Sequence, residues 1–143
     1  MRSPRPSRWT TCSASDTDEW AHAGNYELLL RALHDTDAFL RELWDWLQSQ
    51  PEYRGNTTLI VTTDHGRGRG AKDWTNHAAD VEGAQDIWIA IAGPDDARRG
   101  EWRDSAPLRQ GQVAATIARA FGLDFAEQEP EAYPAIPLSG RPE

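Results

Sequence analysis

The sequence is poor in cysteine and in long apolar runs. Cys12 is its single cysteine, so the chain cannot close an internal disulfide and offers no thiolate metal site. Oxygen and nitrogen side chains are therefore the metal-binding chemistry that remains. No apolar run approaches the length needed to cross a bilayer, and the mean hydropathy is −0.72. We therefore expect a soluble chain that does not act within a membrane.

Positive charge is also scarce. The 15 Lys and Arg residues face 23 Asp and Glu residues, which gives a net charge of −8. Binding to nucleic acid without sequence preference needs a positive surface that displaces counterions, so we expect no nucleic-acid partner. Residues 1–15 lack the apolar stretch of a secretory signal peptide. The compartment and the oligomeric state stay open.

With 143 residues, the chain has the length of one domain, or of a piece of a larger one. Apolar periodicity and turn residues divide it into segments. They are an irregular stretch at 1–15, an amphipathic helix with one buried face at 25–48, a buried parallel strand at 57–63, a short strand at 87–92, a helix at 110–121 closed by Gly122, and a Pro-rich extended tail at 129–143.

This order of helix, strand, loop, strand and helix predicts an α/β fold, an open sheet with flanking helices. The strand at 57–63 is β-branched and almost continuously apolar, which is typical of a parallel strand buried on both faces. Two strands are thin support for an independent fold. We therefore expect a truncated domain.

The first motif with chemical potential is Asp18-x-x-x-His22. In a helical turn these two residues lie at i and i+4 on one face, where both can reach one cation. Taken alone the pattern is common. The competing interpretation is a polar helix start in which Asp18 interacts favourably with the helix dipole.

The second motif, Asp64-His65, follows the strand at 57–63 directly. The carboxyl edge of an open α/β sheet is where ligands bind, so both side chains can point into a crevice there. The competing interpretation is a polar turn favoured by Gly66. His77, in the loop before the second strand, adds a further imidazole. His34 lies inside the long helix and is more typical of a surface or packing residue.

Taken together, the order Asp-x-x-x-His, strand-Asp-His-Gly and a lone His before a strand resembles the C-terminal part of the alkaline phosphatase superfamily. That superfamily includes sulfatases, phosphodiesterases and cofactor-independent phosphoglycerate mutases. The stretch 56–94 carries most of the resemblance, which extends over 16–125. The resemblance implies that residues 16–128 form the C-terminal part of an alkaline-phosphatase-like metalloenzyme domain.

The resemblance also implies two divalent metal ions, zinc or alternatively manganese. One metal would be bound by Asp18, His22 and His77. The second would be bound by Asp64 and His65, and its site would be incomplete in this chain. Two cations in such sites stabilise both the attacking and the leaving oxygen of an in-line displacement.

Relatives supply a further Asp ligand and a Ser or Thr nucleophile from an N-terminal half. The hydroxyl side chains before residue 16 lack a preceding strand and a partner carboxylate, so we assign the nucleophile to none of them. These are Thr10, Thr11, Ser13 and Ser15. We therefore expect little or no turnover from this chain alone.

The leading interpretation is a metal-dependent hydrolase of small-molecule phosphate or sulfate esters, present here as a C-terminal fragment. A phosphoglycerate-mutase-like phosphotransferase fragment is the nearer alternative, because hydrolysis and intramolecular transfer share the metal ligands. From another class, a non-catalytic interaction module would use the seven Trp residues as an exposed apolar surface. The sequence does not separate these three.

Overall fold

The computed structural model describes residues 8–94, 100–101 and 106–138. The chain divides into two compact units, one of residues 13–96 and one that combines residues 1–12 with 97–143. All five residues predicted to bind metal lie in the 13–96 unit. The ends of the predicted N-terminal segment and tail, residues 1–7 and 139–143, lie outside the described residues.

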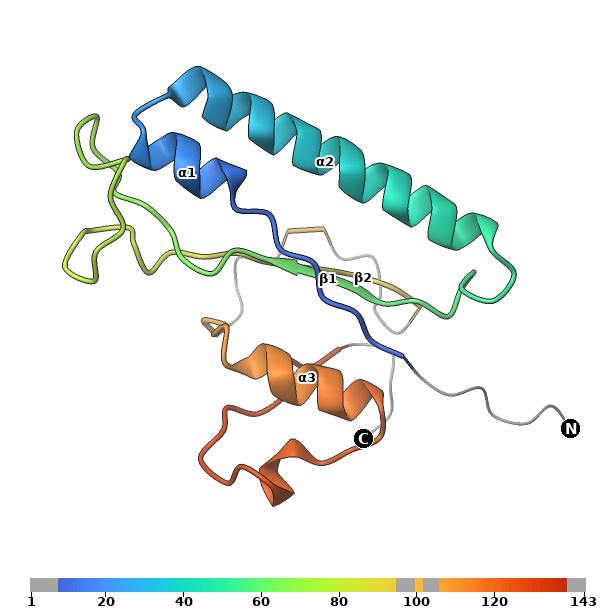
Figure 1. The fold of residues 1–143 in the computed structure, drawn as a ribbon. Helices are drawn as coiled ribbons and strands as arrows, with labels where there is room; N and C mark the ends of the chain where they lie inside the picture. The colour runs from blue at the N-terminus through green and yellow to red at the C-terminus, as the bar shows by residue number, and fades with distance from the viewer. Residues whose placement is uncertain (1–7, 95–99, 102–105, 139–143) are drawn as a thin grey trace, which may run out of the picture. The chain divides into compact units, whose positions relative to one another are not determined.

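The 13–96 unit begins with a helical hairpin of α1 (Asp16–His22) and α2 (Tyr26–Ser49), whose helices run side by side in Figure 1. Gly24, at φ +68°, allows the chain to reverse after α1. Asn25 then starts α2, because its side chain accepts a hydrogen bond from the Leu28 backbone N–H at 3.1 Å. The predicted helix at 25–48 is confirmed.

The two strands of this unit are β1 (Leu59–Thr62) and β2 (Ile89–Ala92). They pair in the antiparallel direction, with Leu59 opposite Ala92 and Thr62 opposite Ile89. The prediction of a parallel strand is therefore wrong. A parallel pair needs a crossover connection, usually a helix, whereas residues 63–88 form a loop without helix or strand. The loop leaves the last residue of β1 and enters β2 beside it, with Thr62 opposite Ile89, so the two strands run in opposite directions.

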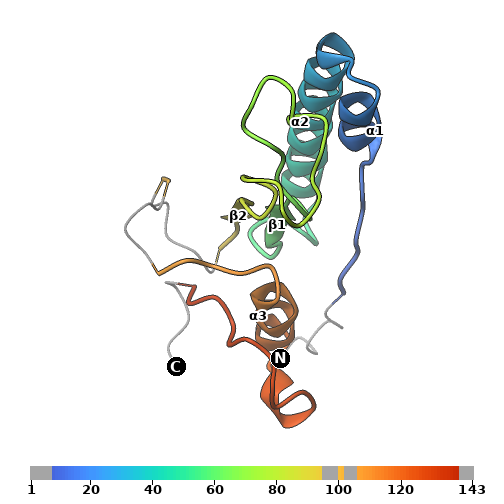
Figure 2. The ribbon, with the colours of Figure 1, turned by 90° about the vertical axis from the view of Figure 1, so that its left-hand side faces the viewer.

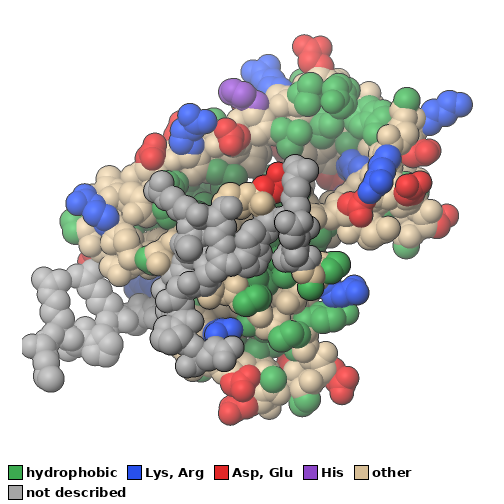
Figure 3. All heavy atoms as spheres, turned by 180° about the vertical axis from the view of Figure 1, so that it is seen from behind, with side chains coloured by type: hydrophobic (Ala, Val, Ile, Leu, Met, Phe, Trp, Pro, Cys, Tyr) green, Lys and Arg blue, Asp and Glu red, His purple; other side chains and the backbone are tan. Residues whose placement is uncertain are grey.

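Burial in the 13–96 unit is also less complete than predicted. All four residues of β1 are half-buried, and β2 alternates between half-buried and exposed positions. Ala32 is the buried residue of α2, while Leu30 and Leu33 on the predicted apolar side are 48% and 49% exposed. The helix therefore covers only part of its apolar surface. Figure 3 shows hydrophobic side chains exposed among charged ones of both signs.

The unit formed by residues 1–12 and 97–143 contains α3 (Gln112–Ala120) and the short 3-10 helix η1 (Phe125–Glu127), which Figure 2 shows from a second side. The predicted helix at 110–121 and its closing Gly122, at φ +74°, are confirmed. Thr116 is fully buried, and its hydroxyl accepts the Ile136 backbone N–H at 2.8 Å. The chain after η1 is held against α3 by this contact.

In the described residues, the fold is thus a mixed arrangement of three α-helices and a small two-stranded antiparallel sheet. This agrees with the predicted combination of helices and sheet, although not with a parallel open sheet. Among the helices that the structure describes, none has the length and apolarity to cross a membrane.

Candidate metal centre

Asp18 and His22 project from α1, and the helix places them on one face as their spacing predicted. His22 Nε2 lies 3.5 Å from Asp18 Oδ2. The side chain of Asp18 is 37% exposed and that of His22 is 47% exposed, so both are open to an ion from solvent. The reversal at Gly24 ends α1 directly after His22, which keeps this imidazole at the tip of the hairpin.

The loop between the strands brings two more imidazoles to Asp18. His65 Nε2 lies 3.5 Å and His77 Nε2 lies 3.7 Å from the same carboxylate oxygen, Oδ1. The two rings are stacked, with centroids 3.7 Å apart and planes inclined by 13°. One potential ligand atom from each of Asp18, His65 and His77 lies within 4.8 Å of the others. We call Asp18, His22, His65 and His77 the Asp-His cluster.

The antiparallel sheet explains why the ends of the loop meet. The Thr62 hydroxyl donates to the Trp88 carbonyl at 2.9 Å, and the Gly66 N–H donates to the Ala84 carbonyl at 2.7 Å. Gly66 lies so close to the returning half of the loop that a Cβ there would overlap the backbone oxygens of Gly83 and Asp86. Glycine at 66 is therefore required for this loop geometry.

The loop also holds the ring of His65 in one orientation. Its Nδ1 lies 2.9 Å from the Gly66 carbonyl oxygen, and because a carbonyl only accepts, Nδ1 carries the proton and donates it. In the neutral imidazole, Nε2 is then the nitrogen with the free lone pair, and it faces Asp18 Oδ1. A hydrogen bond that fixes the other ring nitrogen in this way is usual for an imidazole that binds metal.

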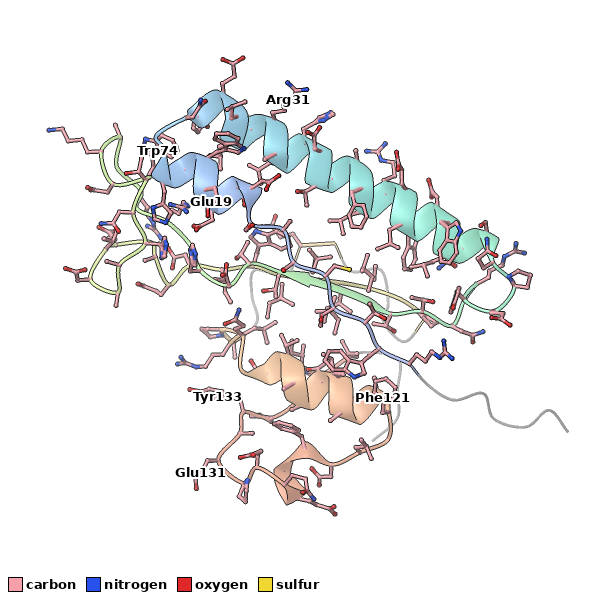
Figure 4. The ribbon with its side chains drawn as sticks, viewed as in Figure 1. Glu19, Arg31, Trp74, Phe121, Glu131 and Tyr133 are labelled. Carbon is pink, nitrogen blue, oxygen red and sulfur yellow. The ribbon has the colours of Figure 1, made fainter. Side chains whose placement is uncertain are left out.

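The second part of the loop is anchored on both sides of His77. The Asn76 side chain accepts the Ala78 N–H at 3.0 Å, and the Gly68 N–H donates to the Asn76 carbonyl at 3.0 Å. Trp74 packs edge-on against Tyr26 at the start of α2, with ring centroids 5.5 Å apart, and Figure 4 shows Trp74 at this end of the hairpin. These contacts place His77 next to His22, with 3.0 Å between the two Nε2 atoms.

Asp64 is less involved than its sequence position suggests. Its side chain is 84% exposed, with Oδ1 3.8 Å from His65 Nε2. The same oxygen accepts the His65 backbone N–H at 3.1 Å. Asp64 is therefore near the Asp-His cluster, but it is outside the group of three whose ligand atoms lie mutually close. His34 is 83% exposed on α2.

Sequence reasoning missed Arg67. Its Nη2 donates to Asp18 Oδ1, and also to the Asp18 backbone oxygen at 3.2 Å. The side chain is only 18% exposed. An Arg between two glycines in a loop carries no pattern that sets it apart, so only the folded loop reveals it. Arg69, two residues later, pairs instead with Asp86, and this hydrogen bond and charge raise the pKa of Arg69 above its usual value.

The donor set fits a divalent cation. Imidazole nitrogens with one carboxylate are ligands that zinc accepts readily and that manganese also accepts. The half-buried, nearly parallel rings of His65 and His77 direct Nε2 atoms toward the same carboxylate oxygen. A divalent cation held by the cluster would therefore place positive charge at one point, and phosphate-ester chemistry uses such a charge.

Comparison with known proteins agrees with this chemistry. Residues 8–125 match the family model of the Metalloenzyme superfamily. A 2,3-bisphosphoglycerate-independent phosphoglycerate mutase from Gracilaria tenuistipitata var. liui is 23% identical over 111 residues. The match covers 78% of this chain and 20% of that protein, so the chain spans about a fifth of the length of its relative. No solved structure matches.

The matched region contains α1, the loop and both strands, and thus every residue of the Asp-His cluster. The resemblance to the alkaline phosphatase superfamily is confirmed at the level of the family. The chain belongs to the Metalloenzyme superfamily, which is alkaline-phosphatase-like.

Proposed function

We propose that the chain provides the metal-binding part of a phosphoryl-transfer site of the phosphoglycerate-mutase type. The observation that carries the proposal is the convergence of Asp18, His65 and His77 on one point. Family membership supports metal dependence, and the named activity of the Gracilaria relative favours transfer over hydrolysis. A metal-dependent phosphate-ester hydrolase is the second candidate, because it would use the same ligands.

In this proposal Asp18 is the central ligand. Its Oδ1 faces His65 and His77, and its Oδ2 faces His22, so one carboxylate connects all three imidazoles. A divalent metal bound here would supply positive charge that neutralises the non-bridging oxygens of a phosphate ester. In the neutral imidazole, the hydrogen bond from His65 Nδ1 to the Gly66 carbonyl leaves Nε2 as the nitrogen that can bind the ion.

The resemblance assigned a second metal to Asp64 and His65. Asp64 Oδ1 lies 3.8 Å from His65 Nε2, but this nitrogen can bind only one ion at a time, and it also faces Asp18 at 3.5 Å. We therefore propose that His65 binds the tightly held ion together with Asp18, and that Asp64 holds a second ion only weakly.

For the substrate we propose a small phosphate ester, with phosphoglycerate as the first candidate. Phosphorus NMR of 3-phosphoglycerate with the Mn²⁺-loaded protein tests this. We expect paramagnetic broadening of the phosphate signal that is lost in Asp18→Asn, since that variant keeps the shape of the side chain but loses its charge.

We expect little turnover from this chain alone, but any product that forms in the same experiment separates the two candidate functions. A new 2-phosphoglycerate signal favours transfer, and inorganic phosphate favours hydrolysis. Equal broadening by the wild-type protein and by Asp18→Asn would mean that phosphate meets Mn²⁺ elsewhere, and the proposed site would be wrong.

A further inference from the structure

Arg67 pairs with Asp18, the carboxylate of the Asp-His cluster, although the proposed chemistry gives it no task. Its Nη2 donates to Asp18 Oδ1, the oxygen that also faces His65 Nε2 at 3.5 Å. The guanidinium therefore lies at the oxygen to which the proposed metal ion would bind. A divalent ion bound to Oδ1 would be placed directly against this permanent cation, and like charges so close repel each other strongly.

The guanidinium is only half satisfied in this position. Nη2 donates to two oxygens of Asp18, the carboxylate Oδ1 and the backbone carbonyl oxygen at 3.2 Å. Nη1 is buried and has no hydrogen-bond partner among the residues that the structure describes. A buried donor without a partner is costly. Exposure of Nη1 to water would therefore favour movement of the side chain toward solvent, and the hydrogen bonds with Asp18 oppose it.

We propose that Arg67 is a built-in competitor of the metal, a guanidinium that pairs with Asp18 in the metal-free protein and leaves Asp18 Oδ1 when a divalent cation binds. This inference rests on the proposed metal centre. It adds that the affinity of the centre is set partly by an exchange of one cation for another, with Asp18 as the shared anion.

The exchange keeps the charge of Asp18 compensated in both states. Without Arg67, the carboxylate of the metal-free protein would face only imidazoles, which carry charge only when protonated. With Arg67 in place, the ion pair holds Asp18 and the backbone of α1 against the loop. Arg67 therefore stabilises the metal-free form and, by linkage, weakens metal binding.

Arg69 offers a matched control from the same loop. It too is an Arg paired with an Asp, in this case Asp86, and it also lies near Glu82. Replacing either Arg by Gln removes one positive charge from the loop. Only the replacement at 67 removes a hydrogen bond from Asp18, so a general charge effect appears in both variants and competition appears in one.

Calorimetric titration of Zn²⁺ into the metal-free wild type, Arg67→Gln and Arg69→Gln measures the effect. We expect Arg67→Gln to bind Zn²⁺ at least about tenfold more tightly than wild type, the factor that loss of one charge-assisted hydrogen bond corresponds to. Arg69→Gln should stay within about threefold, since exposed ion pairs are screened. The rise in Tm on adding Zn²⁺ should also be larger for Arg67→Gln than for wild type.

Affinity in Arg67→Gln that equals that of Arg69→Gln, or that is weaker than wild type, would overturn the inference, since Arg67 would then be neutral or a support for Asp18. If Arg67→Gln does not fold, Arg67→Lys decides, because Lys keeps the charge but lacks the planar fork. Tighter binding than wild type supports competition, and equal or weaker binding rejects it. Absence of Zn²⁺ binding in the wild type itself would reject the metal centre, whereas intact wild-type binding with an unchanged Arg67→Gln would reject only the role of Arg67.

Discussion

The Nε2 atoms of His22 and His77 lie 3.0 Å apart, although the residues are 55 positions apart in the chain. Two neutral imidazoles can make such a contact only if one ring donates and the other accepts. A cation bound by both nitrogens would replace the shared proton. This pair joins the helical hairpin to the loop, and it connects the stability of the 13–96 unit with metal binding.

Replacing His22 tests this connection. His22→Ala should weaken Zn²⁺ binding at least about tenfold, because even residues that only support a ligand typically contribute this much to metal affinity. His34→Ala is the matched control, since His34 is exposed on α2 and pairs there with its neighbour Asp35. Calorimetry on both variants checks the prediction, and an equal loss in the two would contradict a specific role of His22.

Asp64 should contribute to a different and weaker binding event. Its side chain is 84% exposed and stands outside the mutually close group, so Asp64→Asn should leave the first Zn²⁺ equivalent within about threefold of wild type, as for other exposed charges. Binding of a second equivalent should disappear. A loss of the first equivalent would instead make Asp64 a primary ligand.

Metal affinity should fall as the solution is acidified. A proton competes with the metal for the Nε2 lone pair of each histidine that binds it. On acidification, we expect a loss that approaches about tenfold per pH unit for each ring that must lose a proton to bind the ion. Titrations at several pH values give the number of histidines from the slope. A flat profile would mean that the imidazoles do not bind the ion.

Replacing each of two glycines tells a loss of stability apart from a loss of the position of α1. Gly24 and Gly55 have nearly equal positive φ values, +68° and +66°, and a Cβ at either would meet nothing within 4 Å. Replacement by Ala should therefore cost about 1 kcal/mol at each position, entirely from the backbone. Thermal unfolding should show similar losses for the two variants. Only Gly24→Ala should also weaken Zn²⁺ binding, because Gly24 ends the helix that carries Asp18 and His22, and equal binding in the two would argue against this link.

The local elements could be predicted from the sequence because their signals are local. The three- and four-residue apolar spacing identified α2, and Gly122 marked the end of α3. The i, i+4 spacing of Asp18 and His22 likewise needed nothing beyond one helical turn. For these residues, short-range geometry decides the structure.

The direction and the burial of the strands could not be predicted in this way. The apolar run of β1 is typical of a strand covered on both faces, yet β1 is half-buried and antiparallel to β2. The deciding feature is the connection, a loop folded on itself through contacts such as Gly66 with Ala84. Such contacts depend on pairs of residues far apart in the chain, which periodicity does not record.

The same reason applies to the site. The resemblance assigned Asp18 and His65 to two different metal ions, and the loop brings His65 Nε2 to 3.5 Å from Asp18 Oδ1, a closeness that spacing in the sequence does not record. Arg67 gave no sequence signal at all, because its importance comes only from the carboxylate that it meets after folding. Residue type and spacing identified the ligand candidates, and the fold of the loop determines which of them meet.

The most direct test of the account is the metal content of the protein after exposure to excess Zn²⁺ and extensive dialysis against metal-free buffer. Elemental analysis should find about one tightly held Zn²⁺ per chain in the wild type, as a site with at least three protein ligands allows. The double variant Asp18→Asn/His77→Ala should retain almost none, with far-UV circular dichroism confirming that it remains folded. Wild-type protein that loses all its zinc, or a folded double variant that keeps as much as wild type, would contradict the assignment of a metal centre to Asp18, His65 and His77.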